Sequence, residues 1–173
     1  MGSGLAANSL GICYLLGKGT SQNLEEAFLI FKISADAGNP AAFGNLGKCY
    51  MFGYGTNVNS YLGLEYYEKA ADSSFSDAQF FLGSLYYNGA SDYCENASVV
   101  VDYPKAYKYL MMAFENSSTR EEFKGEIARL LSKCYLFGRG VEQNENKAEE
   151  LLEIASQYGD VDAEVIKELL QKP

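Results

Sequence analysis

The sequence contains no histidine and no tryptophan, and only three of its 173 residues are proline. Histidine is the commonest general base and the commonest metal ligand in proteins. Its absence excludes Ser-His-Asp and Cys-His catalysis within this chain, and a zinc site would need cysteines or carboxylates alone. We therefore expect no catalytic residues, no metal and no cofactor.

Basic residues are also scarce, since 14 lysines and arginines face 23 acidic residues and the net charge is −9. Binding to nucleic acid or to an anionic membrane surface relies on clustered Lys and Arg. No segment reaches the roughly 20 apolar residues that cross a bilayer. Residues 1–4 lack the basic region and apolar core of a secretory signal and fit a fragment of a longer chain. We expect neither nucleic-acid binding nor direct membrane insertion.

A repeated motif organises the rest of the chain. "LGICYLLGKGT" begins at Leu10, and related stretches begin at Leu46, Leu82 and Leu131. The first two intervals are 36 residues and the third is 49. Self-similarity at such a period is typical of a stacked array of helical or related units. The sequence therefore predicts a repeat protein.

The stretch Gly17-Lys18-Gly19-Thr20 looks like a phosphate-binding loop, but the other repeats argue against that function. The lysine is replaced by Tyr54, Ala90 and Arg139, whereas the preceding glycine is kept in all four copies. A phosphate-binding loop also needs a preceding strand and a different glycine spacing. We interpret the glycine as a helix stop, because glycine adopts the left-handed conformation at little cost.

Two helices are predicted in each repeat. The first, helix A, follows Ala6, Leu10 and Tyr14 at i, i+4, i+8, and the second, helix B, follows Ala27, Phe31 and Ala35. The glycine after the repeat leucine lowers helix propensity by roughly 1 kcal/mol, which makes sense where a neighbouring helix packs closely. Apart from Val99–Val101, no stretch has the alternation of a strand.

The pattern A-x-x-x-L-G-x-x-Y-x-x-G-x-G, followed by A-x-x-x-[FY]-x-x-A-A-x-x-G, resembles the Sel-one-like repeat family, a relative of the tetratricopeptide repeats. The resemblance implies an all-α, right-handed α-α superhelix. It would consist of four helix-turn-helix repeats in a single domain 1–173, with a C-terminal helix at 161–172. The expected repeats span residues 5–39, 40–75, 76–118 and 119–160.

The third and fourth copies depart from the pattern by insertions. Seven extra residues enter the turn after Leu82, within "GASDYCENASVVVDYP", and six more lie before Leu131. The six are expected to lengthen helix B of the third copy or helix A of the fourth. Ser118 with Glu121, and Thr119 with Glu122, fit capping boxes. These place the start of the fourth helix A near Thr119.

The resemblance implies a non-enzymatic scaffold or adaptor that binds a protein or peptide on the concave face lined by the A helices. By the same resemblance, candidate contact residues flank the repeat leucine. They are Asn8, Ile12, Asn45, Lys48, Phe52, Phe81, Ser84, Tyr87, Asn88, Arg129, Lys133 and Phe137. Interface cores favour aromatics and arginine. For the bulky apolar positions, the competing interpretation is packing between repeats. For the polar positions, it is that the side chains are simply solvated.

The four cysteines bear on the alternatives. Cys13, Cys49 and Cys134 share one repeat position with Leu85, so buried free thiols are expected. Some secreted relatives bridge helix A to helix B and are linked to β-lactam binding, but this chain has no helix-B cysteine. A hydrolase of that kind is disfavoured. A cytoplasmic adaptor is favoured, with a regulatory fragment of a membrane or ER quality-control complex in the secretory pathway as the alternative. The first repeat starts directly at helix A, which suggests a truncated array or association of copies through the array ends.

Overall fold

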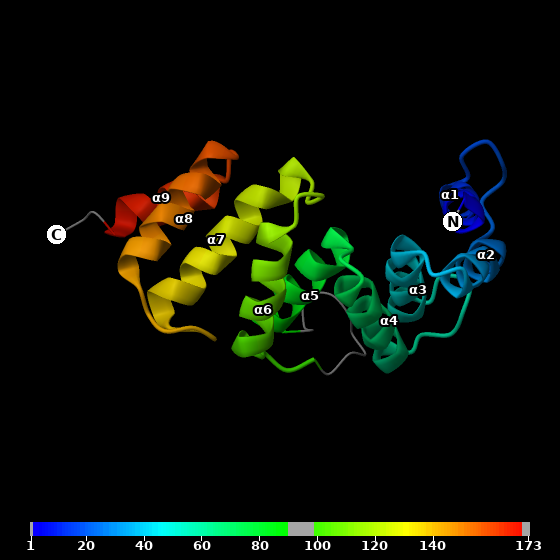
Figure 1. The fold of residues 1–173 in the computed structure, drawn as a ribbon, viewed down its shortest axis with the longest axis horizontal. Coiled ribbons are helices and arrows are strands. Elements are labelled where there is room, and N and C mark those ends of the chain that lie inside the picture. The colour runs from blue at the N-terminus through cyan, green and yellow to red at the C-terminus, as the bar shows by residue number, and fades with distance from the viewer. Residues whose placement is uncertain (1, 90–98, 171–173) are drawn as a thin grey trace. The chain divides into compact units, whose positions relative to one another are not determined.

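The computed structural model describes residues 2–89 and 99–170. These two ranges contain helices and connecting turns but no strand, and Val99–Val101 is irregular (Figure 1). The helices are α1 Gly2–Leu16, α2 Leu24–Asp36, α3 Pro40–Phe52, α4 Ser60–Asp72, α5 Ser76–Asn88, α6 Tyr103–Glu115, α7 Glu121–Phe137, α8 Glu145–Gln157 and α9 Val161–Leu170. The predicted all-α repeat fold with a C-terminal helix is confirmed.

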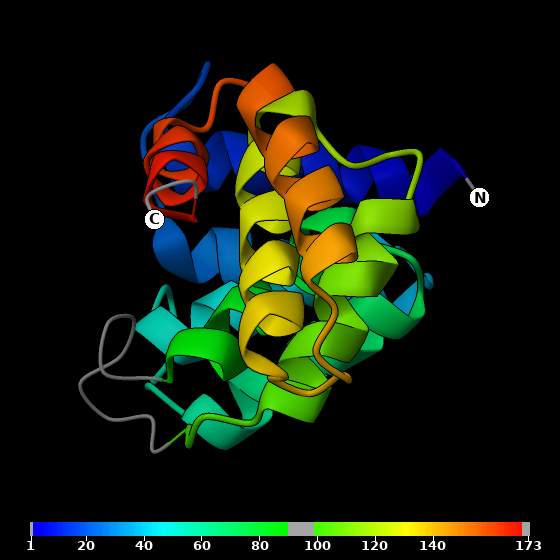
Figure 2. The same ribbon diagram turned by 90° about the vertical axis from the view of Figure 1, so that its left-hand side faces the viewer.

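The chain divides into two compact units at a boundary inside α5. Among the described residues, the first unit runs to Ala78 and holds α1–α4. The second begins at Gln79 and holds most of α5 together with α6–α9. In each unit a helix A packs along the helix B that follows it, as α7 and α8 do in Figure 2.

Close approach of the two helices in a pair depends on the glycine after the repeat leucine. A Cβ atom on Gly47 would lie 2.7 Å from a ring carbon of Tyr67 in α4, and one on Gly11 would lie 2.5 Å from Phe31 in α2. Both distances are far inside van der Waals contact, so a side chain at this position would push the helices apart. The predicted close packing at this glycine is confirmed.

The turn between helices A and B is the same in the first, second and fourth repeats. The glycine that ends helix A is left-handed, with φ of +66° at Gly17, +72° at Gly53 and +62° at Gly138. The residue after it donates its N–H to the carbonyl of the cysteine four residues before the glycine, as Tyr54 does to Cys49 at 2.9 Å. Such a bond satisfies a carbonyl that the helix end leaves without a partner. The interpretation of this motif as a helix stop is confirmed.

Each helix B begins with an N-cap whose side chain accepts a hydrogen bond from the backbone N–H three residues later. The four N-caps are Asn23, Asn59, Asp102 and Asn144. Each of these residues also donates its own backbone N–H to the carbonyl of the repeat tyrosine at the end of helix A. The cap therefore starts one helix and satisfies the end of the other.

The insertion before Leu131 lengthens helix A of the fourth repeat. The α7 helix has 17 residues, compared with 13 in α3. The predicted capping boxes are wrong, because the N-cap is Arg120 and its side chain makes no capping hydrogen bond. The hydroxyl of Thr119 instead donates to the carbonyl of Ala113, at the end of α6, at 2.6 Å.

The repeat leucine is not in the core of every copy. Leu46 and Leu131 are 1% and 0% exposed, because α3 packs between α2 and α4, and α7 between α6 and α8. Leu10 is 49% exposed, and Ala6 on the preceding turn is exposed as well. Both residues of α1 keep the helix-A spacing, but no described helix packs against them.

Candidate partner-binding surface

A cation and an aromatic ring lie one turn apart at the end of helix A in the second repeat. Lys48 and Phe52 are both exposed and occupy positions i and i+4 of α3, which share one helix face. The ring of Tyr54, in the following turn, lies 5.8 Å from that of Phe52. The ammonium nitrogen of Lys48 is 6.0 Å from the centre of the Tyr54 ring. The two rings form a small apolar surface, and the positive charge of Lys48 lies beside it.

The fourth repeat carries the same pair at the equivalent positions. Lys133 and Phe137 are four residues apart on α7, and Phe137 is 62% exposed. The guanidinium of Arg139 lies 5.0 Å from the Phe137 ring and 4.9 Å from that of Tyr103. We call Lys48 with Phe52, and Lys133 with Phe137, the two Lys–Phe pairs. Each lies within one unit of the chain.

Arg139 is held in place by the aromatic side chains around it. Its Nη1 donates a hydrogen bond to the hydroxyl of Tyr87 at 2.7 Å. Burial raises the pKa of Tyr87, and the hydrogen bond from Arg139 partly opposes that shift. Tyr87 therefore stays neutral at physiological pH and acts as the acceptor. A guanidinium fixed among rings in this way keeps its charge and its orientation.

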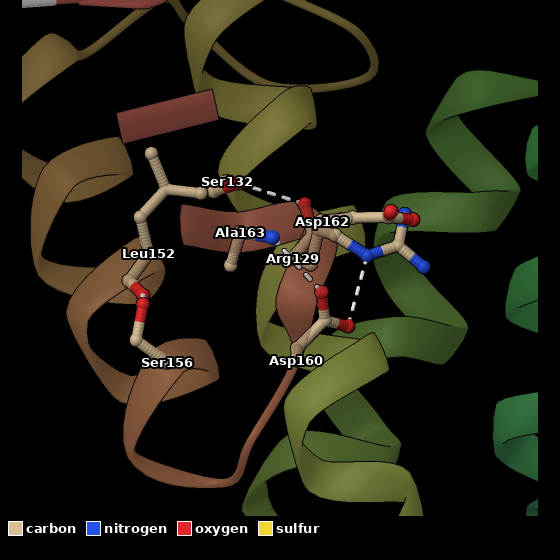
Figure 3. Close-up of polar contacts among 7 residues, drawn as sticks. All are labelled: Arg129, Ser132, Leu152, Ser156, Asp160, Asp162 and Ala163. Atoms are coloured by element: carbon tan, nitrogen blue, oxygen red, sulfur yellow. Dashed lines mark hydrogen bonds and ion pairs between the residues drawn. The ribbon is translucent and has the colours of Figure 1, made fainter. Parts of the chain in front are cut away.

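Arg129, which the sequence placed on the same face, already has a carboxylate partner. Its Nε donates to Oδ2 of Asp160 at 2.9 Å, and both side chains are largely buried (Figure 3). The other oxygen of Asp160 accepts the backbone N–H of Ala163 at the start of α9. The Arg129 charge is therefore neutralised inside the protein, and it links α7 to α9.

Lys133 lies one turn beyond Arg129 and has no such partner. It is half-buried, and among the described residues it makes no hydrogen bond or ion pair. Burial lowers the pKa of Lys133, and the charge of Arg129 lowers it further, whereas the carboxylates of Asp162 and Asp160 partly oppose the shift. A partly desolvated ammonium that makes no direct ion pair is stabilised by an approaching carboxylate.

The remaining candidate residues lie in several different environments. Asn8 is buried, and its Oδ1 accepts a hydrogen bond from Asn45 at 2.9 Å, which joins α1 to α3. Ile12 packs against the core of the first unit. Ser84 is buried, and its hydroxyl has no hydrogen-bond partner in the described part of the chain. Phe81 is half-buried, whereas Asn88 is exposed.

Three of the four cysteines lie in described segments, and all three are free thiols. Cys49 and Cys134 are buried, as predicted, whereas Cys13 is half-buried. Burial raises the pKa of Cys49 to about 11 and that of Cys134 to about 12, so both thiols are protonated at neutral pH. Cys94 lies outside the described residues.

Two further kinds of site are absent from the described residues. No group of three or more cysteine or acidic side chains there is placed to hold a metal ion. None of the helices in the same ranges combines the length and apolar character that crossing a bilayer requires.

Sequence reasoning missed the turn residues Tyr54 and Arg139, which complete the two surfaces, and the acidic partner of Arg129. The turn residues occupy the position of Lys18 in the first repeat. The variation at this position between repeats argues against a phosphate site. The same variation indicates that the residue here has a different function in each repeat. Asp160 is 31 residues from Arg129, and no local pattern joins the two.

The chain repeats the same helix A–helix B pair, and exposed side chains recur at equivalent helix-A positions. These features are typical of helical-repeat proteins that bind partners through their surface. The Sel1 repeat profile matches residues 4–39, 44–75, 76–118 and 128–160. The chain belongs to the Sel1 repeat family, whose members are generally protein–protein interaction scaffolds and typically non-enzymatic. A search of curated protein sequences returned no match.

Solved structures of similar proteins support the same fold. A Sel1 repeat protein from Oxalobacter formigenes is 28% identical, with a TM-score of 0.75 over 92% of this chain and 60% of its own. A protective antigen of uropathogenic Escherichia coli with an SLR fold is 23% identical, with a TM-score of 0.59 over 94% of this chain and 40% of its own. Cysteine rich protein B of Helicobacter pylori is 21% identical, with a TM-score of 0.52 over 83% of this chain and 97% of its own. The chain thus spans about 60% and 40% of the first two proteins.

Proposed function

We propose that this protein is a non-enzymatic scaffold that binds a partner protein through the exposed helix-A side chains, with the two Lys–Phe pairs as its main contacts. The observation that carries the proposal is Lys133. It is a half-buried cation that makes no hydrogen bond or ion pair in the described structure, and it lies one turn from an aromatic side chain that is 62% exposed. The same spacing of a lysine and an aromatic ring recurs at Lys48 and Phe52, where both side chains are exposed.

The chemistry of these pairs specifies the ligand. An exposed phenylalanine gains free energy when an apolar side chain covers it, and a lysine beside it gains a charge-assisted hydrogen bond from a carboxylate. The preferred ligand is a protein segment in which an acidic residue lies next to an aromatic or aliphatic one. The rest of the chain is acidic, with a net charge of −9, so these local cations distinguish the binding surface from its surroundings.

A cytoplasmic location is part of the same proposal. It rests on the three free thiols Cys13, Cys49 and Cys134, because disulfide bonds persist mainly in oxidising compartments.

The proposal can be tested without a known partner, by selecting binders from a random peptide library displayed on phage. We expect the selected peptides to combine Asp or Glu with an adjacent aromatic or aliphatic residue. For a synthetic peptide of the selected sequence, Lys133→Ala and Phe137→Ala should each raise the dissociation constant about tenfold, the effect of losing one interface contact of ordinary strength. Neither change should lower the melting temperature by more than a few degrees, since both side chains contact solvent.

Matched controls are available on the B helices. Ile33 in α2 is 62% exposed, like Phe137, and Lys108 in α6 is exposed. Ile33→Ala and Lys108→Ala remove comparable side chains from the other side of the helix pairs and should leave peptide affinity unchanged. Binding that is lost in these controls but kept in the Lys133 and Phe137 variants would assign the ligand to the B helices and reject the proposal.

A further inference from the structure

The residue between the two glycines of the helix A–helix B turn lies beside each Lys–Phe pair and differs between them. It is Tyr54 in the second repeat and Arg139 in the fourth. The backbone around it is the same in both copies, because the glycines on either side are left-handed. The turn residue also donates its N–H to the carbonyl of a helix-A cysteine, at 2.9 Å for Tyr54 and 2.8 Å for Arg139. The same scaffold therefore presents a different side chain to each pair.

Both turns touch the preceding repeat at the first residue of its helix B. A Cβ atom on the second glycine of the turn would lie 2.0 Å from the carbonyl oxygen of Leu24 at Gly55. At Gly140 the distance to the carbonyl oxygen of Tyr103 would be 2.2 Å. Leu24 and Tyr103 therefore occupy equivalent positions, one beside each turn residue.

The neighbours of the turn residue change together with it. Tyr54 and Leu15 both pack against the apolar core of the first unit. The position of Leu15, five residues after the repeat leucine, is Tyr87 in the third repeat. Arg139 donates a hydrogen bond to the hydroxyl of Tyr87 at 2.7 Å, and its guanidinium lies 4.9 Å from the ring of Tyr103. Leucines thus surround the tyrosine, and tyrosines surround the arginine.

The tyrosines hold Arg139 in place but do not neutralise its charge. Of the three arginines in the sequence, Arg120 pairs with Glu122 and Arg129 with Asp160, both at 2.9 Å. Arg139 makes no ion pair within the described ranges, where its only hydrogen bond is the one from Nη1 to a neutral phenol. A guanidinium has five N–H donors in a planar fork that matches a carboxylate. Donors on the fork are therefore available to an acidic ligand.

A second cation lies near Arg139. After burial and the charge of Arg129, the charge of Arg139 is a further cause that lowers the pKa of Lys133. This effect shows that the two cations are close enough to interact. Because each also lacks an ion pair in the described structure, two carboxylates can approach them together and relieve their mutual repulsion.

The second repeat offers less charge and more apolar surface. Tyr54 takes the place of the arginine, and its ring lies 5.8 Å from the exposed ring of Phe52. Lys48 supplies the cation of this pair, and its ammonium nitrogen is 6.0 Å from the centre of the Tyr54 ring. A second carboxylate placed against these rings would lose hydration without gaining an ion pair to the turn residue.

We propose that the turn residue determines which ligand each Lys–Phe pair prefers. Arg139 gives the fourth repeat a preference for a protein segment with two acidic residues beside an apolar one. Tyr54 gives the second repeat no preference for the second acidic residue. The inference rests on the proposed function, since both ligands are forms of the same acidic and apolar segment. Arg139 is already oriented by its aromatic neighbours, so it loses little side-chain freedom when a carboxylate binds.

Three synthetic peptides of equal length test the preference. The first contains an Asp-Phe pair flanked by serines, and in the other two the serine before or after the pair is replaced by aspartate. Lys48→Ala with Phe52→Ala leaves only the fourth-repeat site, and Lys133→Ala with Phe137→Ala leaves only the second-repeat site. Fluorescence anisotropy of labelled peptides gives the dissociation constants. The fourth-repeat site should bind the better two-acid peptide about fivefold or more tightly than the one-acid peptide, and the second-repeat site should bind them alike.

Variants of Arg139 separate its charge from its structural contacts. Arg139→Gln keeps a side-chain N–H donor at this position but removes the charge, and should bring the ratio of the two dissociation constants at the fourth-repeat site close to one. Arg139→Lys keeps the charge and should retain part of the preference. A side chain that only held the turn in place would weaken both peptides by the same factor. An unchanged ratio in Arg139→Gln would therefore overturn the proposal.

Arg120 provides a matched control in the same unit. Its guanidinium also lies over an aromatic ring, 4.2 Å from the centre of Phe123, but it is paired with Glu122 and lies at the opposite end of α7. Arg120→Gln changes the net charge of the protein by the same amount as Arg139→Gln and should leave the ratio unchanged. An equal loss of preference in both variants would assign it to net charge and reject the proposal.

Failure of this inference can be told apart from failure of the proposed function. If neither site bound any of the three peptides, the Lys–Phe pairs would not be binding sites and both proposals would be wrong. If both sites bound the peptides but Arg139→Gln left the ratio unchanged, the pairs would bind acidic segments and only the selection by the turn residue would be rejected.

Discussion

Among single residues, the second glycine of the helix A–helix B turn gives the most sensitive test of how neighbouring repeats touch. Gly19 and Gly55 have almost the same backbone conformation, so alanine at either site costs about 1–2 kcal/mol for the left-handed region. Only at Gly55 would the new Cβ meet a carbonyl oxygen, at 2.0 Å. Overpacking of that kind adds about 1–3 kcal/mol. Urea denaturation should therefore show a clearly larger loss of unfolding free energy for Gly55→Ala than for Gly19→Ala.

Gly19→Ala serves as the control, because it carries the conformational cost without the steric one. Equal losses in the two variants would mean that the start of α2 moves away from Gly55 at no cost. The contact between the first and second repeats would then be looser than the structure describes.

The same pair of glycines shows what the sequence can and cannot predict about a residue. Both occupy one position of one motif, and the motif predicts their conformation. It does not predict their neighbours, because a repeat pattern records a position within a unit and not what lies beside that unit. Leu10 and Leu46 likewise share one position of the motif, yet only Leu46 is buried.

At the scale of the helix, the N-caps of the B helices make a separable contribution to stability. In Asn59→Ala the N–H of Leu62 loses its acceptor, and the free energy of unfolding should fall by about 1 kcal/mol, as for other N-cap deletions. Asn59→Asp keeps the acceptor and adds a negative charge at a helix start with no acidic residue in its first turn. That charge should stabilise the helix by about 0.3–1 kcal/mol at neutral pH. Thermal or urea denaturation of the two variants provides the measurement.

Titration provides the control for the aspartate variant. The added stability depends on an ionised carboxylate, so it should be lost in acid as the side chain is protonated. A gain that persisted unchanged in acid would indicate a cause other than the interaction of charge with the helix start.

Helix starts also show where local sequence patterns succeed and fail. The predicted capping box at Thr119 has the right residues at the right spacing, but the Thr119 hydroxyl bonds to the carbonyl of Ala113 in the preceding helix. A hydroxyl that could form either of two hydrogen bonds forms the one whose partner the surrounding structure places within reach. The four helix-B caps could have been found from the sequence, since in three repeats an asparagine follows the helix-stop glycine by six residues.

At the scale of the whole chain, the binding surface could be predicted only in part. The period placed Lys48 and Lys133 at equivalent positions of helix A, and helix geometry placed Phe52 and Phe137 beside them. The charge available at each site depends on contacts between distant residues. Arg129 and Lys133 lie one turn apart on α7, yet Asp160 forms its ion pair with the arginine.

Stability across the chain should follow its division into two units. In repeat proteins each unit contributes its own stability together with that of its nearest contacts, so a core mutation should act mainly on its own unit. Leu46→Ala and Leu131→Ala remove equally buried side chains from the first and second units, and each should lower local stability by about 2–5 kcal/mol. Native-state hydrogen exchange should show faster exchange in α1–α4 for Leu46→Ala and in α6–α9 for Leu131→Ala. If both variants accelerated exchange equally in all described helices, the chain would unfold as one cooperative body. The two compact units would then not unfold independently.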